Sequence, residues 1–186
     1  MDLVSLSLEG YVSVDVETAG PNPGQYSLLS IGACLVVDPQ RTFYAELQPV
    51  NENARPEAMA ISGLSLAELA ERGLPPAEAM ARFEAWLAAE IPPDRAPVFV
   101  AFNAPFDWMF VTDYFYRFLG RNPFGHAALD IKGFYMGLTG EDWSQTGMAH
   151  VAARYLGGRP LIHNALRDAQ DQAELFVKMV AELDAR

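Results

Sequence analysis

Residues 11–16 have the sequence YVSVDV, in which three valines alternate with other residues. Side chains at every second position of a β-strand point to the same face. The three valines therefore face a core, whereas Asp15 and the following Glu17 share the opposite face. Two carboxylates at the end of a buried strand are costly unless they are neutralised. The pattern thus predicts a central strand that leads into a functional site.

Two more strands are predicted directly after this one, at 28–37 and 42–48, separated by residues typical of turns. Three consecutive strands of this kind are typical of an antiparallel meander. The hydrophobic period then changes to that of helices, with two further strands between them. Helices are expected at 56–60, 65–72, 76–90, 105–119, 132–138, 146–156 and 164–184, and the further strands at 97–102 and 127–131. The order predicts a mixed α/β fold.

The chain has 186 residues, of which 51% are hydrophobic and 20% charged, so one globular domain over 1–186 is expected. A single cysteine, Cys34, excludes a disulfide framework and a Cys-rich metal site. No apolar run reaches the ~20 residues that span a membrane. The first ten residues, MDLVSLSLEG, lack the pattern of a secretory signal. A cytoplasmic protein without a membrane partner is therefore expected.

The formal net charge of −11 disfavours a protein that grips long duplex DNA through many phosphates. A nucleic-acid enzyme with a small footprint is still compatible with it. Within 117–167 basic residues outnumber acidic ones. This segment either forms a surface for a polyanion or only carries arginines scattered over the surface. Its basic residues are Arg117, Arg121, Lys132, Arg154, Arg159 and Arg167.

Two further segments place polar residues where a predicted strand or loop enters a helix. Asn103 follows the strand at 97–102, and Asp107 falls in the first turn of the next helix. His163 precedes the last helix, and Asp168 lies early in that helix. Alone, either segment is equally typical of a helix cap and an acidic residue that complements the helix dipole.

In combination, the Asp-x-Glu strand, the Asn-x₃-Asp junction and the His-x₄-Asp helix start resemble the DEDD exonuclease superfamily, in its His-bearing branch. The stretch DVETAGPNPGQYSLLSIGAC is most similar to ribonuclease T and its close relatives, and the resemblance covers about residues 11–180. It implies a ribonuclease H-like mixed sheet with parallel strands added to the antiparallel ones and helices on its flanks. Phe102 departs from the pattern, because many members have His there.

Hydrolysis of a phosphodiester adds negative charge to the attacking and leaving oxygens, which two divalent cations stabilise together. Mg²⁺ and Mn²⁺ prefer oxygen ligands. The expected ligands are therefore Asp15, Glu17, Asp107 and Asp168. His163 is the candidate general base, a role that suits its near-neutral pKa. No function is expected of His126 or His150.

The resemblance also implies how substrate binds. The backbone of Thr18 and Ala19 would contact the terminal sugar, and Phe106 would pack against bases beside Asn103. Base stacking tolerates any sequence. Trp108 is instead expected in the core.

The main hypothesis is a metal-dependent 3′–5′ exonuclease that acts on single-stranded RNA or DNA. An oligoribonuclease-like hydrolase of very short oligonucleotides and a non-catalytic nucleic-acid-binding subunit with the same fold are the alternatives. The resemblance to ribonuclease T and oligoribonuclease also implies a homodimer.

Overall fold

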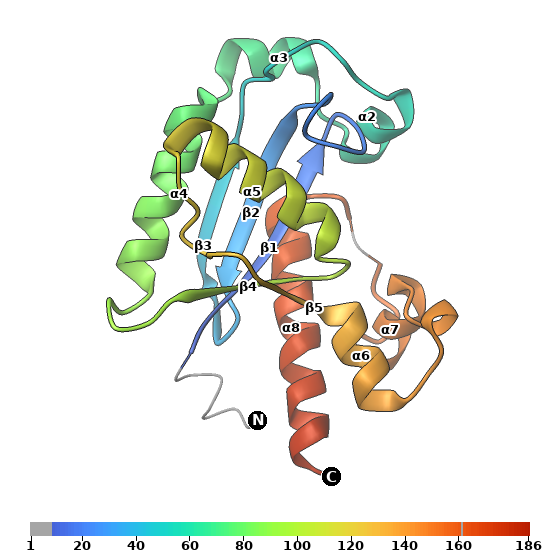
Figure 1. Cartoon of the computed structure of the whole chain (residues 1–186). Helices are drawn as coiled ribbons and strands as arrows, with labels where there is room; N and C mark the ends of the chain where they lie inside the picture. Colours follow the sequence, from blue (N-terminus) through green and yellow to red (C-terminus); the bar gives the residue numbers. More distant parts are fainter. Residues whose placement is uncertain (1–8, 161) are drawn as a thin grey trace.

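The computed structural model describes residues 9–160 and 162–186 and contains a five-stranded sheet flanked by helices (Figure 1). The strands are β1 (Gly10–Thr18), β2 (Leu28–Leu35), β3 (Asp38–Glu46), β4 (Pro97–Ala101) and β5 (Ala128–Asp130). The helices are α2 (Pro56–Ser62), α3 (Leu66–Arg72), α4 (Pro76–Glu90), α5 (Pro105–Leu119), α6 (Ile131–Thr139), α7 (Met148–Tyr155) and α8 (Ala165–Asp184), with a short 3₁₀ helix at Trp143–Gln145. None of these helices is long and apolar enough to cross a membrane.

The sheet has the strand order β3-β2-β1-β4-β5, which places β1 at its centre. The first three strands pair antiparallel, whereas β4 pairs parallel with both β1 and β5. The predicted meander and the mixed α/β fold are confirmed. The carboxyl ends of β1 and β4 meet at one edge of the sheet, which is where open α/β sheets place their ligands.

The two faces of β1 contact different layers. Val12 and Val14 are fully buried and belong to the same hydrophobic cluster as Phe83 of α4 and Phe110 of α5. The opposite face is covered by α8, and α6 and α7 pack beside that helix (Figure 1). The alternation at 11–16 therefore separates a hydrophobic layer from the face that carries the carboxylates.

The predictions were most accurate where proline and glycine mark the ends of a helix. Helices α4 and α5 have the predicted bounds, and each begins at a proline. Helix α5 ends before Gly120, whose φ of 70° is the left-handed conformation that glycine adopts without strain.

The predicted start of the third strand was wrong, because that strand starts four residues earlier, at Asp38. Leu35 pairs with Asp38, so Val36 and Val37 form a tight turn and do not extend β2. Pro39 is compatible with pairing here because β3 is an edge strand. The helix expected at 146–156 is also shorter, since Gly147 caps α7.

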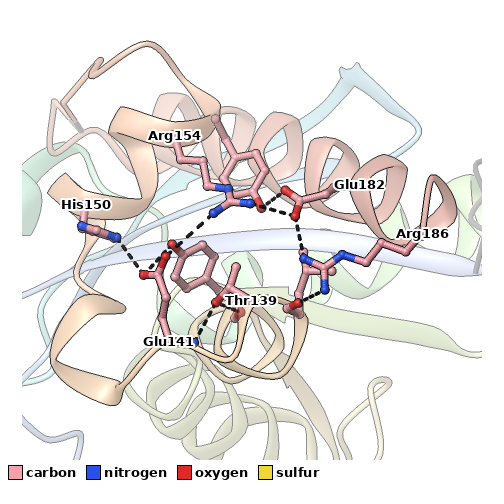
Figure 2. A network of polar contacts seen from close by, with 9 residues as sticks. Thr139, Glu141, His150, Arg154, Glu182 and Arg186 are labelled. Carbon is pink, nitrogen blue, oxygen red and sulfur yellow. Dashed lines mark hydrogen bonds and ion pairs between the residues drawn. The ribbon is translucent and has the colours of Figure 1, made fainter.

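A polar network joins α6 and α7 to the far end of α8 (Figure 2). The Glu141 carboxylate accepts a hydrogen bond from the Tyr135 hydroxyl at 2.9 Å and lies 2.8 Å from His150 Nε2. Arg154 lies between this carboxylate and Glu182 of α8, at 3.8 Å and 2.8 Å. The acidic partner of His150 comes from the loop before α7 and was not predicted. The network links these helices far from the carboxylates of β1.

The start of α8 lies directly against β2 at Gly32. An added Cβ at this glycine would lie 2.1 Å from the carbonyl carbon of Ala165 and 2.2 Å from the amide nitrogen of Leu166. Both atoms belong to the backbone, so rotation of a side chain cannot relieve the overlap. The position of the first turn of α8, and with it that of Asp168, therefore depends on the absence of a side chain at residue 32.

Gly32→Ala should destabilise the protein by roughly 1–3 kcal/mol, because α8 must move away from the sheet. The activity expected from the sequence should fall as well, since Asp168 moves with the helix. Gly137→Ala is the matched control, because nothing lies within 4 Å of the added Cβ and the residue is inside α6. That variant should gain up to about 1 kcal/mol. Thermal melts that show equal stability for both variants would contradict this role of Gly32.

Candidate active site

Strand β1 presents Asp15 and Glu17 on the face that α8 covers. Glu17 is 9% exposed, and Asp15 is half-buried. The pairing of β1 with β2 shifts register between Glu17 and Thr18. Such bulges bend a strand and redirect side chains beside functional sites.

The segment after β4 brings Asp107 to the end of β1. Asn103 has a φ of 63°, a strained conformation for a residue with a side chain, and it turns the chain into α5. The amide of Ala104 donates to Asp130 Oδ1 at 3.0 Å, which fixes this turn to β5. Asp107 is buried and accepts a hydrogen bond from the Val16 amide at 3.1 Å. The Asp107 carboxylate therefore lies at the end of β1. It is not a surface residue that only complements the helix dipole.

Asp168 holds the loop that carries His163. Its two carboxylate oxygens accept hydrogen bonds from the amides of Ile162 at 3.0 Å and His163 at 2.9 Å. His163 has a φ of 56°, so this loop is also strained. The Asn164 side chain caps α8 as predicted, by accepting from the Arg167 amide. The imidazole is thus placed at the start of α8 while Asp168 itself is buried.

These segments meet in one cavity of about 240 Å³. It is lined by Asp15, Val16, Glu17, Thr18, Ala58, Ile61, Phe102, Asn103, Phe106, Asp107, His163 and Asp168. All the predicted catalytic and metal-binding residues are in this set. Among the predicted substrate residues, only Ala19 is outside it.

Ala19 is fully buried, and its backbone groups are already bonded within the chain. Its amide donates to the Ser27 carbonyl at 2.9 Å, and its carbonyl accepts from the Arg55 amide at 2.7 Å. The geometry therefore gives no support to its prediction as a substrate-binding residue. Trp108 is partly buried and packs edge-on against the core residue Phe99, with 5.2 Å between ring centroids.

The cavity also contains residues that the sequence analysis did not select. Ala58 and Ile61 lie one turn apart on α2, and Ile61 is exposed. A spacing of three residues is the only sequence signal that they share a face. Phe102, at the position that departs from the family pattern, lines the cavity and packs on the core beneath α8.

Burial and mutual repulsion raise the pKa values of the clustered carboxyl groups. Burial, followed by the charge of Asp168, raises the pKa of Glu17 to about 7. Burial raises the pKa of Asp107 to about 8, although the Val16 amide opposes this shift. The pKa of Asp15 lies well above its usual range because of burial and the charges of Asp107, Asp168 and Glu17. A group of carboxyls this close resists full ionisation unless positive charge enters the cavity.

The donor atoms fit a hard divalent cation. Glu17, His163 and Asp168 each offer a ligand atom, and these atoms all lie within 4.8 Å of one another. Asp15 and Asp107 add carboxylate oxygens to the same cavity. Oxygen-rich sites of this composition suit hard divalent cations.

The raised pKa values predict how stability depends on pH without metal. Consider a carboxyl group whose pKa in the folded state is higher than its ordinary value of about 4. Its contribution to stability is fully present below pH 4 and is lost as the pH rises through the folded-state pKa. In EDTA, the melting temperature should therefore fall between pH 5 and pH 9, across the pKa values of Glu17 and Asp107. Asp107→Asn should reduce this fall, and excess Mg²⁺ should oppose it.

Asp94→Asn, at an exposed loop position, removes the same formal charge and should leave the slope unchanged. Equal slopes for wild type, Asp107→Asn and Asp94→Asn would show that the cavity carboxyls do not cause the pH dependence.

Comparison with known proteins gives the same assignment as the geometry. The RNase_T family, described as exonuclease, matches residues 12–176. The chain is 48% identical over 168 residues to the 3′–5′ DNA exonuclease Cap18 of Escherichia coli, covering 90% of each protein.

Solved structures share the fold at low sequence identity. The nuclease domain of 3′hExo, a DEDDh family member bound to rAMP, has a TM-score of 0.75 at 14% identity and 92% coverage of both chains. Pop2p of S. pombe, in a form with bound Mg²⁺ and Mn²⁺, has a TM-score of 0.66 at 17% identity, covering 95% of this chain and 85% of that one. The family match over nearly the whole chain shows that this protein belongs to the RNase_T exonuclease family, and it is a 3′–5′ exonuclease of the DEDD superfamily.

Proposed function

We propose that this exonuclease, as one domain, removes nucleotides from the 3′ end of single-stranded DNA with two divalent cations and a histidine general base. The observation that carries the proposal is the convergence of four carboxyl groups and His163 on one small cavity. The choice of DNA rests on the 48% identical relative, which is a DNA exonuclease.

Asp15, Glu17, Asp107 and Asp168 would hold the cations, because they supply the oxygen ligands of the cavity. When bound, Mg²⁺ or Mn²⁺ supplies positive charge that stabilises the attacking and leaving oxygens of the phosphodiester. The protein contributes the fixed positions of the carboxylates. Hydrogen bonds from Val16, Ile162 and His163 amides already orient two of them.

His163 accepts the proton of the attacking water in this proposal. The side chain is exposed, whereas its backbone amide is bonded to the buried Asp168. An imidazole in this position exchanges its proton with solvent after each turnover. Histidine is the side chain that most often serves as a general base.

The walls of the cavity suit the end of a single strand. A volume of about 240 Å³ is below the roughly 300–1,000 Å³ of most ligand pockets, a size that favours one terminal nucleotide over a base pair. Phe102, Phe106 and Ile61 offer apolar surface for a terminal base, and Thr18 and Asn103 offer polar groups for its sugar. Apolar contact of this kind does not discriminate among bases.

Long-range attraction contributes little to substrate binding in this proposal. Arg117, Arg121 and Arg159 of the basic stretch are bonded to Asp113, Glu84 and Glu174 on the surface. This favours scattered arginines over a continuous polyanion surface. A homodimer and a cytoplasmic location, both expected from the sequence, stay predictions.

The decisive assay uses a 5′-labelled single strand with Mg²⁺ and with EDTA. The proposal expects a descending ladder with Mg²⁺, none with EDTA, and slower loss of RNA of the same sequence. Immediate release of the labelled mononucleotide would contradict the polarity, and full activity in EDTA would contradict the metal requirement. Turnover confined to strands of two or three nucleotides would support the oligoribonuclease-like alternative.

His163→Ala should lower kcat by roughly 10²–10⁴, because the proton acceptor is lost while all four carboxylates stay. Part of the loss should be recovered at high pH, where hydroxide is more abundant. His126→Ala, in an exposed loop, is the matched control and should keep wild-type kcat. An unchanged kcat for His163→Ala at neutral pH would remove this residue from the mechanism.

A further inference from the structure

A glutamine inside α8 connects two of the segments that form the cavity. Gln172 is 1% exposed and both ends of its amide are bonded. Its Nε2 donates to Asp15 Oδ1 at 2.7 Å. Its Oε1 accepts from the Phe102 amide at 2.9 Å. It lies four residues after Asp168, one helical turn further along the same face.

The two contacts occur where the backbone pairing between β1 and β4 stops. The last paired residues of these parallel strands are Ser13 and Val100. Asp15 and Phe102 each lie two residues beyond that pair, so they would be the next pair on the same face of the sheet. The side chain of Gln172 bonds to the Asp15 carboxylate on one side and to the Phe102 amide on the other. A side chain of α8 therefore links β1 to the segment after β4, in addition to the hydrogen bond between the Val16 amide and Asp107.

A buried amide in this environment has a cost that its two hydrogen bonds must offset. Neighbouring positions of the same helix, such as Ala173 and Phe176, are fully buried hydrophobic residues of the core. The polar side chain at position 172 fits a specific task, because it bonds to one carboxylate oxygen of Asp15, and among residues 9–160 and 162–186 the other oxygen has no hydrogen bond.

We propose that Gln172 is a positioning residue of the exonuclease, which orients the Asp15 carboxylate for divalent cations and ties it to the segment that carries Asp107. The inference rests on the metal site proposed above. Hydrogen-bond partners behind metal ligands typically contribute about 10- to 100-fold to metal affinity or activity. A residue that only packs between helix and sheet would affect stability and leave cation binding unchanged.

Gln172→Met tests this directly, because Met keeps the length of the side chain and removes both hydrogen bonds. Gln170→Met is the matched control on the same helix. Its amide bonds to the Pro39 carbonyl at 2.8 Å and takes no part in the cavity. Binding of Mn²⁺ is measured by calorimetry without nucleic acid. The apparent Mg²⁺ activation constant and the KM for the oligonucleotide are measured separately.

Gln172→Met should raise the Kd for Mn²⁺ and the Mg²⁺ activation constant by about tenfold or more. KM for the oligonucleotide at saturating Mg²⁺ should change little, and Gln170→Met should match wild type. If Gln172→Met does not fold, Gln172→Asn carries the test, because its shorter amide cannot reach both partners. It should also weaken Mn²⁺ binding.

The outcomes separate this inference from the proposed function. Wild type that binds no Mn²⁺ would overturn the metal site and, with it, the role of Gln172. Wild type that binds Mn²⁺ with the same Kd as the Gln172 variants would overturn the role of Gln172 alone. Lower melting temperatures with unchanged Mn²⁺ affinity would likewise assign the residue to packing.

Discussion

Repulsion among four carboxyl groups in one small cavity is the constraint on which the rest of the structure depends. Asp15 and Glu17 arrive on the central strand, and Asp107 and Asp168 arrive on helices from opposite faces of the sheet. Burying negative charges this close together costs free energy unless hydrogen bonds or positive charges compensate for it. The cavity is therefore stabilised by fixed donors from the chain and by protons that its carboxyl groups retain, and we propose that bound cations replace those protons in the active enzyme. Stability and activity are in conflict at this site, as is common for charged active sites.

The chain meets this constraint with contacts between residues that are distant in sequence. The Val16 amide supports Asp107, the amides of Ile162 and His163 support Asp168, and the Gln172 side chain supports Asp15. The approach of α8 to Gly32 makes the last two possible, since it seats the helix on the sheet. On the other face of β1, the hydrophobic core formed with α4 and α5 holds the strand in place.

The sequence was sufficient for the fold class and for the ionisable residues of the cavity. Alternation along β1 and the proline-marked starts of α4 and α5 are local signals, and the structure has these elements as predicted. Contacts between residues far apart in the sequence were not predicted. Gln172 and Asp15 are 157 residues apart, and no local pattern relates them. The start of β3 was misplaced because a strand and a tight turn compete over the same few residues.

The most direct test of the central claim is a Mn²⁺ titration of the wild-type protein at pH 7, followed by calorimetry in buffers of different ionisation enthalpy. With pKa values of about 7 for Glu17 and about 8 for Asp107, part of the cavity is protonated at this pH. Cation binding requires ionised ligands and releases those protons. We predict about two ions per chain, with proton release at pH 7 that vanishes near pH 10. Absence of saturable binding, or binding without proton release at pH 7, would contradict it.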